Sequence, residues 1–366
     1  MINAAIIGMG RWGQTLVNSV AGGSDVIRFT AGMTRTLSKV EDYAAEKGIR
    51  LHGSYEDVLA DNDVNAVVLA SPHSAHFDQM MAAADAGKHV FCEKPFCLTG
   101  AHAKTALDTL SEKGLKVAIG HNRRFSPNAI RLKEMIESGD LGDMIQIEGN
   151  FSANMAGYSG EWRDSRAESP VGGMTSLGIH AVDMFVNLFG YVANVHVLSK
   201  RVAIPFDIDD ATGILMEFEN GQVGYLGTVA ATGHLWQVRT FGTKGWGCIY
   251  GHDRFDVQMT DGSTDAETWD GYEYPGMPTI RDQMECFGRH CEGTDTFPAT
   301  PDQILHATQV LEAIIRSAES GERIPVGYIA EASPDRKPIY VVNRPSGWRN
   351  CVIQLVHSFP YTPGSI

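Results

Sequence analysis

The fold is decided by the sequence Ala4-Ala5-Ile6-Ile7-Gly8-Met9-Gly10-Arg11-Trp12-Gly13. Its first four residues predict a short buried strand, and the residues from Gln14 to Val20 have a helical pattern. Between strand and helix, the GxGxxG spacing allows a tight turn, close approach of a pyrophosphate to the backbone, and packing of helix on strand. The helix N-terminus then faces the phosphates. The alternative is a merely structural glycine-rich turn. We assign dinucleotide binding to Gly8, Met9, Gly10, Arg11, Trp12 and Gly13.

The second predicted strand, Val26 to Ala31, bears on the choice of cofactor. In NAD-specific sites an acidic residue about 20 residues beyond the glycines binds the ribose 2′-hydroxyl. This chain has Met33-Thr34-Arg35-Thr36 at that place, with no acid. A carboxylate would repel a 2′-phosphate, whereas a hydroxyl beside a guanidinium would bind one. We therefore predict NADP, with NAD possible, contacted by Thr34 and Arg35. The alternative is that Arg35 stacks on adenine without discriminating.

Strands and helices alternate through the first third of the chain, which predicts a parallel, doubly wound sheet. The further buried strands are predicted at 66–70, 88–92 and 116–119. The helices are predicted at 38–47, 55–59, 79–86 and 101–113. We assign residues 1–122 to this dinucleotide-binding domain.

Polar residues follow two of these strands, at the edge where open α/β sheets bind ligands. The first group is Ser71-Pro72-His73-Ser74-Ala75-His76, from which we assign Ser71, Pro72 and His76 to the cofactor. His76 could instead form only capping bonds at a helix start. The second group is Glu93-Lys94-Pro95, where the proline restricts the backbone and should hold Lys94 in a set direction. The alternative for Lys94 is a surface lysine in a turn.

The pattern changes to period two from Met144, which predicts a second domain over residues 123–330 with a largely antiparallel sheet. Strands are predicted at 144–148, 192–199, 211–219, 222–230, 235–241 and 255–259, with a hairpin turn at Asn220-Gly221. Helices follow at 281–291 and 301–320, the latter with Thr300 and Gln303 forming a capping box. The tail 331–366 has no clear period, and its role as docking arm, extra strand or unrelated sequence stays open.

A second polar cluster runs from Gly172 to Asp183. If it is helical from about Thr175, Ser176 and His180 lie on one face, and His180 and Asp183 are neighbours. An imidazole between a hydroxyl and a carboxylate can share a proton near neutral pH. The alternative is a satisfied core histidine. No second His or Cys stands at metal-ligand spacing, and no GxSxG elbow suggests a hydrolase.

Composition narrows the possible partners. A chain of 366 residues suggests two domains. The net charge of −14 disfavours binding to nucleic acid or to an anionic membrane. No apolar run approaches the roughly 18 residues of a membrane span, and no basic region precedes the N-terminal apolar run as in a signal peptide. The six cysteines lack metal-type spacing, so we expect reduced thiols in a cytoplasmic protein without a metal.

The motifs together resemble the Gfo/Idh/MocA family of NAD(P)-dependent oxidoreductases over about residues 3–327. The matching motifs, in order, are Gly8–Gly13, Ser71-Pro72 with His76, Glu93-Lys94-Pro95, Asn122-Arg123-Arg124-Phe125, Glu161-Trp162-Arg163 and Gly172–Asp183. The resemblance implies an N-terminal Rossmann domain and a C-terminal α/β domain with a large, mainly antiparallel open sheet. That sheet would bind substrate and carry a homodimer or homotetramer contact. Typical substrates are sugars, cyclic polyols and related hydroxy compounds, including dihydrodiols.

Position by position, the resemblance implies that Lys94 is the catalytic lysine and His180 the active-site histidine. It also implies that Glu93, Lys94 and Asn122 contact the cofactor. The family's aspartate four residues before the histidine is Ser176 here, and a serine cannot act as a carboxylate base. Proton transfer then depends on Lys94 and His180. The candidate substrate residues are Ser176, Trp162, Arg163 and Asp183.

Three functions remain open on the sequence. The first is an NADP-dependent dehydrogenase that interconverts an alcohol with a ketone or aldehyde on a sugar or polyol. The second is a dihydrodiol dehydrogenase acting on an aromatic-derived diol. The third is a non-catalytic, NADP-sensing protein on the same fold, although such a sensor would need neither Lys94 nor His180.

Overall fold

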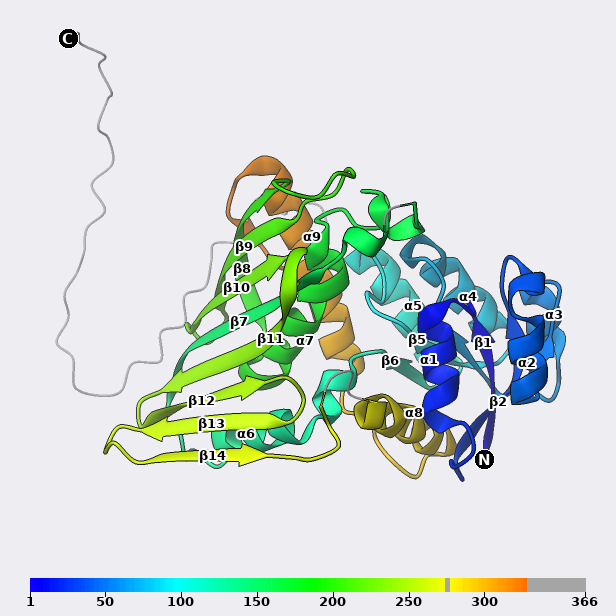
Figure 1. Ribbon diagram of the computed structural model, residues 1–366, viewed down its shortest axis with the longest axis horizontal. Helices are drawn as coiled ribbons and strands as arrows, with labels where there is room; N and C mark the ends of the chain where they lie inside the picture. The colour runs from blue at the N-terminus through cyan, green and yellow to red at the C-terminus, as the bar shows by residue number, and fades with distance from the viewer. Residues whose placement is uncertain (159, 274–276, 328–366) are drawn as a thin grey trace, which may run out of the picture. The chain divides into compact units, whose positions relative to one another are not determined.

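The computed structural model describes residues 1–327 except 159 and 274–276 (Figure 1). The predicted tail, 331–366, lies outside the described residues. Over the described part, strands and helices alternate first and a long run of strands follows, as the sequence predicts. Within that part, every helix is too short or too polar to cross a membrane.

The first sheet has the parallel, doubly wound arrangement that the alternation of strands and helices predicts. In the described residues it has six strands in the order β3-β2-β1-β4-β5-β6, all paired in parallel. The strands are β1 (Ile2–Ile7), β2 (Ile27–Met33), β3 (Arg50–Leu51), β4 (Ala66–Leu69), β5 (His89–Cys92) and β6 (Val117–Ile119). β4 and β6 are buried throughout, which explains their continuous apolar sequences. Two residues are too few to give β3 a recognisable pattern.

Helices connect these strands as expected, with shifts of a few residues at their ends. They are α1 (Arg11–Val20), α2 (Glu41–Lys47), α3 (Tyr55–Ala60), α4 (His76–Asp85) and α5 (Gly100–Glu112). α4 and α5 pack side by side (Figure 1). The helix predicted from residue 38 begins at Glu41 instead, because a short 3-10 turn, Leu37–Lys39, precedes it. α4 begins three residues before the predicted start, directly after another 3-10 turn, His73–Ala75.

The second sheet has nine described strands in the order β14-β13-β12-β11-β7-β10-β9-β8-β15. Among them only β7 and β10 pair in parallel, so the sheet is mainly antiparallel. The strands are β7 (Met144–Asn154), β8 (Val192–Lys200), β9 (Ala211–Phe218), β10 (Val223–Val229), β11 (Ala231–Gly242), β12 (Gly245–Tyr250), β13 (Arg254–Met259), β14 (Thr264–Thr268) and β15 (Ile324–Pro325). The hairpin turn at Asn220-Gly221 is confirmed: it joins β9 to β10, with Gly221 at φ 85°.

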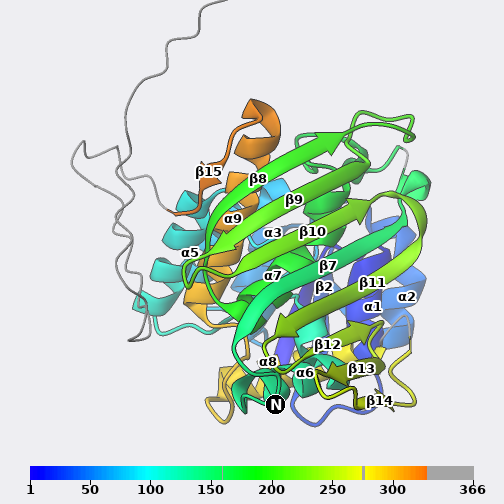
Figure 2. The same ribbon diagram turned by 90° about the vertical axis from the view of Figure 1, so that its left-hand side faces the viewer.

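Helices cover one face of this sheet. They are α6 (Pro127–Glu137), α7 (Ile179–Phe189) and α9 (Pro301–Ser320), which contact β12, β7 and β8 respectively. Figure 2 shows the strands in front of these helices. The capping box of α9 is confirmed, with the Thr300 side chain accepting from the Gln303 backbone N–H. The face away from the helices exposes apolar side chains, among them Leu198, Leu215, Val223 and Tyr225.

Helix α8 (Met277–Glu292) departs from the division at residue 122, because it packs in the core of the first sheet rather than the second. Ile280, Met284 and Phe287 are buried there, and the Phe287 ring lies 5.6 Å from the ring of Phe91 on β5. α8 also lies beside α1 (Figure 1) and against the 3-10 turn Asn122–Phe125. The first core is therefore built from two separate segments of the chain.

Candidate active site

The glycine loop between β1 and α1 has the shape that a pyrophosphate requires. Gly8 has φ +94°, and a Cβ there would lie 2.6 Å from the Ala70 carbonyl oxygen. A Cβ on Gly13 would lie 2.0 Å from the Gly8 carbonyl oxygen, so neither position accepts a side chain. Gly10 has no atom within 4 Å of the corresponding position, and it is the N-cap of α1. The open backbone of Gly10 at a helix N-terminus fits a dinucleotide phosphate.

The other residues of the loop have different surroundings. Met9 is buried in the first core, and Trp12 is half-buried and packs against that core. Arg11 is exposed at the first position of α1. The Gly8 N–H donates to the Met33 carbonyl at 2.9 Å, which places the end of β2 beside the glycine turn. Thr34, half-buried, and Arg35, exposed, follow directly, so the predicted adenosine-ribose contacts adjoin the phosphate loop.

His76 joins two loops of the candidate site. It is fully buried, with Nδ1 3.0 Å from the Pro95 carbonyl and Nε2 3.2 Å from the Ser71 carbonyl. Burial lowers the pKa of His76 and favours the neutral ring. Ser71 is half-buried and its hydroxyl donates to Gln79, while Pro72 caps the 3-10 turn that follows. Because both its ring nitrogens face backbone carbonyls, His76 positions the loop that carries Lys94.

Lys94 reaches from the first sheet to the second polar cluster. It follows β5, is partly buried, and its Nζ donates to the Ser176 carbonyl at 2.7 Å. Burial, assisted by the nearby Arg163 and Arg123 and opposed by Glu93, lowers the pKa of Lys94 to about 8. An amine with such a pKa can gain and lose a proton near neutral pH.

Glu93 lies beneath this lysine. It is buried, and a Cβ on Gly120 would lie 2.5 Å from its Oε1, so the glycine leaves room for the carboxylate. Burial raises the pKa of Glu93, while Lys94 and Trp12 oppose the shift. The carboxylate also accepts from the Lys94 backbone N–H at 3.3 Å. Glu93 is thus a counter-charge that raises the pKa of the Lys94 amine.

Ser176 and His180 lie on consecutive segments of one helical stretch. Ser176 is in a π-helical turn, Met174–Gly178, which leads into α7. The sequence predicts an ordinary helix from Thr175, and the wider turn was not foreseen. Both side chains are buried, and the Ser176 hydroxyl and His180 Nδ1 have no hydrogen-bond partner among the described residues. Burial lowers the pKa of His180 far below its usual range, and the charges of Arg123 and Lys94 make smaller contributions in the same direction.

Asp183, three residues after His180, is committed to a different partner. Its Oδ1 accepts from Arg124 Nη2 at 2.7 Å and its Oδ2 from Arg124 Nε at 2.9 Å. Arg124 also donates to Asn187, to Gln303 and to the Pro298 carbonyl. The structure therefore places Asp183 in a buried, fully hydrogen-bonded ion pair, where it joins α7 to the turn after β6.

The remaining predicted residues lie around the Lys94 loop or behind it. Trp162 packs edge-on against His73, with ring centroids 4.7 Å apart, and the Arg163 guanidinium lies 4.0 Å from the Trp162 ring. Arg163 is close enough to Lys94 to affect its pKa. Asn122, in contrast, donates to the Thr279 hydroxyl at 2.7 Å in a buried position and anchors α8.

The structure adds residues that sequence reasoning did not assign to the site. His121 and Arg123 follow β6, and both are buried. The His121 ring lies 5.4 Å from the His180 ring, and the Arg123 guanidinium lies 4.3 Å from the Phe151 ring. The signal that could have identified these two residues is their place directly after a strand of the parallel sheet. His252, buried in the turn after β12, had no comparable signal.

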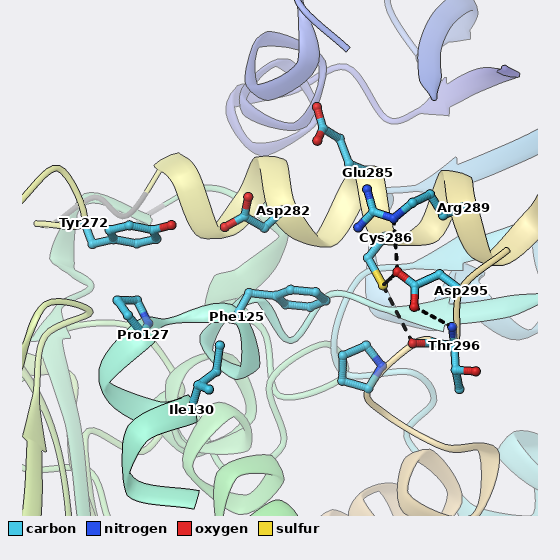
Figure 3. Close-up of a pocket in the computed structure, with 11 residues that line it drawn as sticks. Phe125, Pro127, Ile130, Tyr272, Asp282, Glu285, Cys286, Arg289, Asp295 and Thr296 are labelled. Carbon is cyan, nitrogen blue, oxygen red and sulfur yellow. Dashed lines mark hydrogen bonds and ion pairs between the residues drawn. The ribbon is translucent and has the colours of Figure 1, made fainter. Parts of the chain in front are cut away.

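A surface depression of about 390 Å³ lies elsewhere, between α6 and α8 (Figure 3). Phe125, Pro127 and Ile130 line one side, and the Arg289–Asp295 ion pair lies opposite. It contains no residue that the sequence assigns to the site. In the described part of the chain, no three His, Cys, Asp or Glu side chains are grouped as metal ligands.

The sequence matches two family models: the Gfo/Idh/MocA oxidoreductase family, NAD-binding Rossmann fold, over residues 2–121, and the Gfo/Idh/MocA C-terminal domain over residues 129–247. An uncharacterized oxidoreductase of Schizosaccharomyces pombe is 27% identical over 331 residues, covering 80% of this chain and 89% of that protein. The D-xylose 1-dehydrogenase (NADP(+)) 2 of Haloferax volcanii is 25% identical over 301 residues, covering 80% and 90%. A solved NAD binding oxidoreductase from Klebsiella pneumoniae shares the fold, with a TM-score of 0.78, 21% identity, and coverage of 89% and 99%.

Proposed function

This chain belongs to the Gfo/Idh/MocA family of NAD-binding oxidoreductases, and from that premise we propose that it interconverts an alcohol with a ketone or aldehyde on a sugar, cyclic polyol or related hydroxy compound. The observation that carries the proposal is the 2.7 Å hydrogen bond from Lys94 Nζ to the Ser176 carbonyl. It joins the amine to the helical stretch that contains His180. The relative named as a D-xylose dehydrogenase supports a sugar-like substrate.

Proton transfer in this proposal is the work of Lys94, with His180 beside it. A nicotinamide cofactor held by the glycine loop would supply the hydride acceptor or donor. In oxidation, neutral Lys94 accepts the hydroxyl proton, and in reduction its ammonium returns the proton to the oxygen. The pKa of about 8 makes both forms accessible. Neutral His180 has Nδ1 available to bond the same hydroxyl, and the Ser176 hydroxyl can hydrogen-bond the substrate but cannot act as the base.

NADP is the cofactor that we propose this chain prefers. Support comes from the loop after β2, where Thr34 and exposed Arg35 stand and no carboxylate lies between residues 33 and 36. A guanidinium there can form charge-assisted hydrogen bonds with a 2′-phosphate, and no acid repels it.

A substrate panel tests the activity. We would measure consumption of NADP or NADPH with sugars, inositols and dihydrodiols, together with cofactor binding by fluorescence. Turnover of at least one sugar or polyol is the expected result. Turnover of dihydrodiols alone would move the assignment to that class of diol. Tight cofactor binding without turnover of any panel member would contradict an enzyme and favour the NADP-sensing alternative.

The open face of the second sheet is the contact through which we propose that the chain forms a homodimer or homotetramer. Leu215 on β9 pairs directly with Tyr225 on β10, and both are exposed beside Leu198 and Val223. An exposed apolar patch of this kind marks an interaction site. Light scattering should give the mass of a dimer or tetramer, and Tyr225→Glu should lower it; a wild-type monomer would contradict the proposal.

We also propose a cytoplasmic location. Support comes from the cysteines of the described residues, Cys92, Cys97, Cys248, Cys286 and Cys291, which are all free thiols. Fractionation of the native host cells should place the protein in the cytoplasmic fraction; recovery from an oxidising compartment would contradict this location.

A further inference from the structure

We propose that the substrate is an acidic sugar or polyol, of the uronic or aldonic acid class, and that Arg123 binds its carboxylate. The inference rests on the proposed dehydrogenase function and narrows its substrate class. The observation behind it is a guanidinium in contact with two aromatic rings, beside the helix of His180 and among buried polar atoms that have no hydrogen-bond partner among the described residues.

The position of Arg123 is built by both halves of the molecule. Arg123 follows β6 of the first sheet, while Phe151 on β7 and Trp236 on β11 are register partners in the second sheet. The Arg123 guanidinium lies 4.3 Å from the Phe151 ring and 4.7 Å from the Trp236 ring. These two rings lie edge to face, 75° apart, so cation–π contacts restrain the guanidinium from two directions, and its N–H donors all lie in its own plane. The arrangement therefore presents donors in a fixed plane, as recognition of a carboxylate requires.

Buried polar atoms surround this position. The Phe151 ring that contacts Arg123 also lies 5.8 Å from the His180 ring, and the His121 ring lies 5.4 Å from His180. His180 Nδ1, both ring nitrogens of His121, His252 Nδ1 and the Ser176 hydroxyl are buried with no hydrogen-bond partner among the described residues. Buried polar atoms are seldom left without partners, because each costs free energy. A polyhydroxylated ligand would supply partners to several of them at once.

The charges near Arg123 favour an anion. Arg123 and Arg163 are both close enough to Lys94 to lower its pKa. Ser176, whose carbonyl accepts from Lys94 Nζ, has an uncharged side chain. The Asp183 carboxylate is bound by Arg124. Convergent cations attract an anionic substrate, so a carboxylate on the substrate would supply a counter-charge to them.

The test compares matched acidic and neutral sugars on the intact protein. The pairs are D-glucuronate with D-glucose and D-galacturonate with D-galactose, and D-glucose 6-phosphate tests a different anion. Variants are Arg123→Met, which keeps the packing and removes the charge, and Arg123→Lys, which keeps the charge and removes the planar donors. Arg254→Met is the control, because Arg254 is an exposed arginine that stacks on Tyr250 and pairs with Asp256.

We expect wild-type kcat/KM to be higher for each acid than for its neutral partner. With rates compared above the rising limb of the pH profile, Arg123→Met should lower kcat/KM for the acids about 10- to 100-fold more than for the neutral sugars, the range of a lost hydrogen bond to a charged group. Arg123→Lys should fall between, and Arg254→Met should match wild type. If Arg123→Met fails to fold, the Lys variant decides. A wild-type preference for neutral sugars, a preference for the phosphate, or an equal loss on acid and neutral substrates would overturn the inference.

A binding measurement distinguishes a failure of this inference from a failure of the proposed function. Calorimetric titration of D-glucuronate into the NADP-loaded protein should show binding that Arg123→Met weakens. If no sugar is turned over but this Arg123-dependent binding is found, the dehydrogenase proposal fails and the carboxylate site stands. If neutral sugars are turned over and D-glucuronate does not bind, the carboxylate site fails and the dehydrogenase stands.

Discussion

Two stretches of the same helical segment differ in how completely their polar atoms are paired. At Asp183, both carboxylate oxygens accept from Arg124, which itself reaches three further acceptors. One and two turns earlier, His180 and Ser176 are also buried and keep polar atoms with no partner among the described residues. A completed buried network stabilises a structure, whereas an incomplete one is costly unless a ligand completes it. The paired atoms around Asp183 therefore stabilise the fold, whereas the unpaired atoms around His180 belong to the proposed reaction site.

The largest expected effect comes from breaking the buried ion pair between Asp183 and Arg124. Asp183→Asn leaves the Arg124 guanidinium buried without its counter-charge, so the free energy of unfolding should fall by about 3–5 kcal/mol. Urea denaturation measures the change. The control is Asp295→Asn in the solvent-exposed Arg289–Asp295 pair, for which at most about 1 kcal/mol is expected. Equal losses of stability in both variants would show that the buried ion pair stabilises the fold no more than the exposed one.

A substitution of His180 should affect turnover rather than stability. His180→Gln keeps a hydrogen-bonding side chain but cannot exchange a proton, so kcat should fall by about 100-fold if His180 takes part in proton transfer. The urea midpoint should stay near that of the wild type. A large loss of stability with unchanged kcat would make His180 a structural histidine instead.

A smaller effect is expected on cofactor affinity when Arg35 is replaced. Arg35 is exposed after β2, and Arg35→Ala removes a charge-assisted bond to a 2′-phosphate. The Kd for NADPH should rise about tenfold while the Kd for NADH changes little. Fluorescence titration of both cofactors measures this. Tighter binding of NADH than NADPH by the wild type would contradict the NADP preference.

The smallest expected effect is a shift in pH dependence. Lys94 must be neutral to accept a proton, so kcat/KM for oxidation should rise as pH passes about 8, and the rate of reduction should fall over the same range. Arg123 and Arg163 lower the pKa of Lys94 and Glu93 raises it. Arg123→Met removes one of the lowering charges, so the rising limb should move to higher pH. An unmoved limb would show that the titrating group lies away from Arg123.

Local patterns in the sequence predicted the elements and the glycine loop, because strand, helix and turn signals each depend on a few neighbouring residues. They could not show that α8 returns to the first core, since that contact joins Phe287 to Phe91. The spacing of His180 and Asp183 suggested a pair, but it could not reveal Arg124, which lies 59 residues before Asp183 in the chain. The π-helical turn at Ser176 and the aromatic contacts of Arg123 likewise depend on packing between distant segments.

The central claim, that Lys94 transfers the proton, is tested most directly by chemical rescue of Lys94→Ala. On the best substrate of the panel and at saturating cofactor, turnover should fall by about 100-fold or more, and added methylamine should restore part of the rate. Lys113→Ala, at an exposed lysine after α5, is the control and should match the wild type. Unchanged turnover in Lys94→Ala would contradict the account.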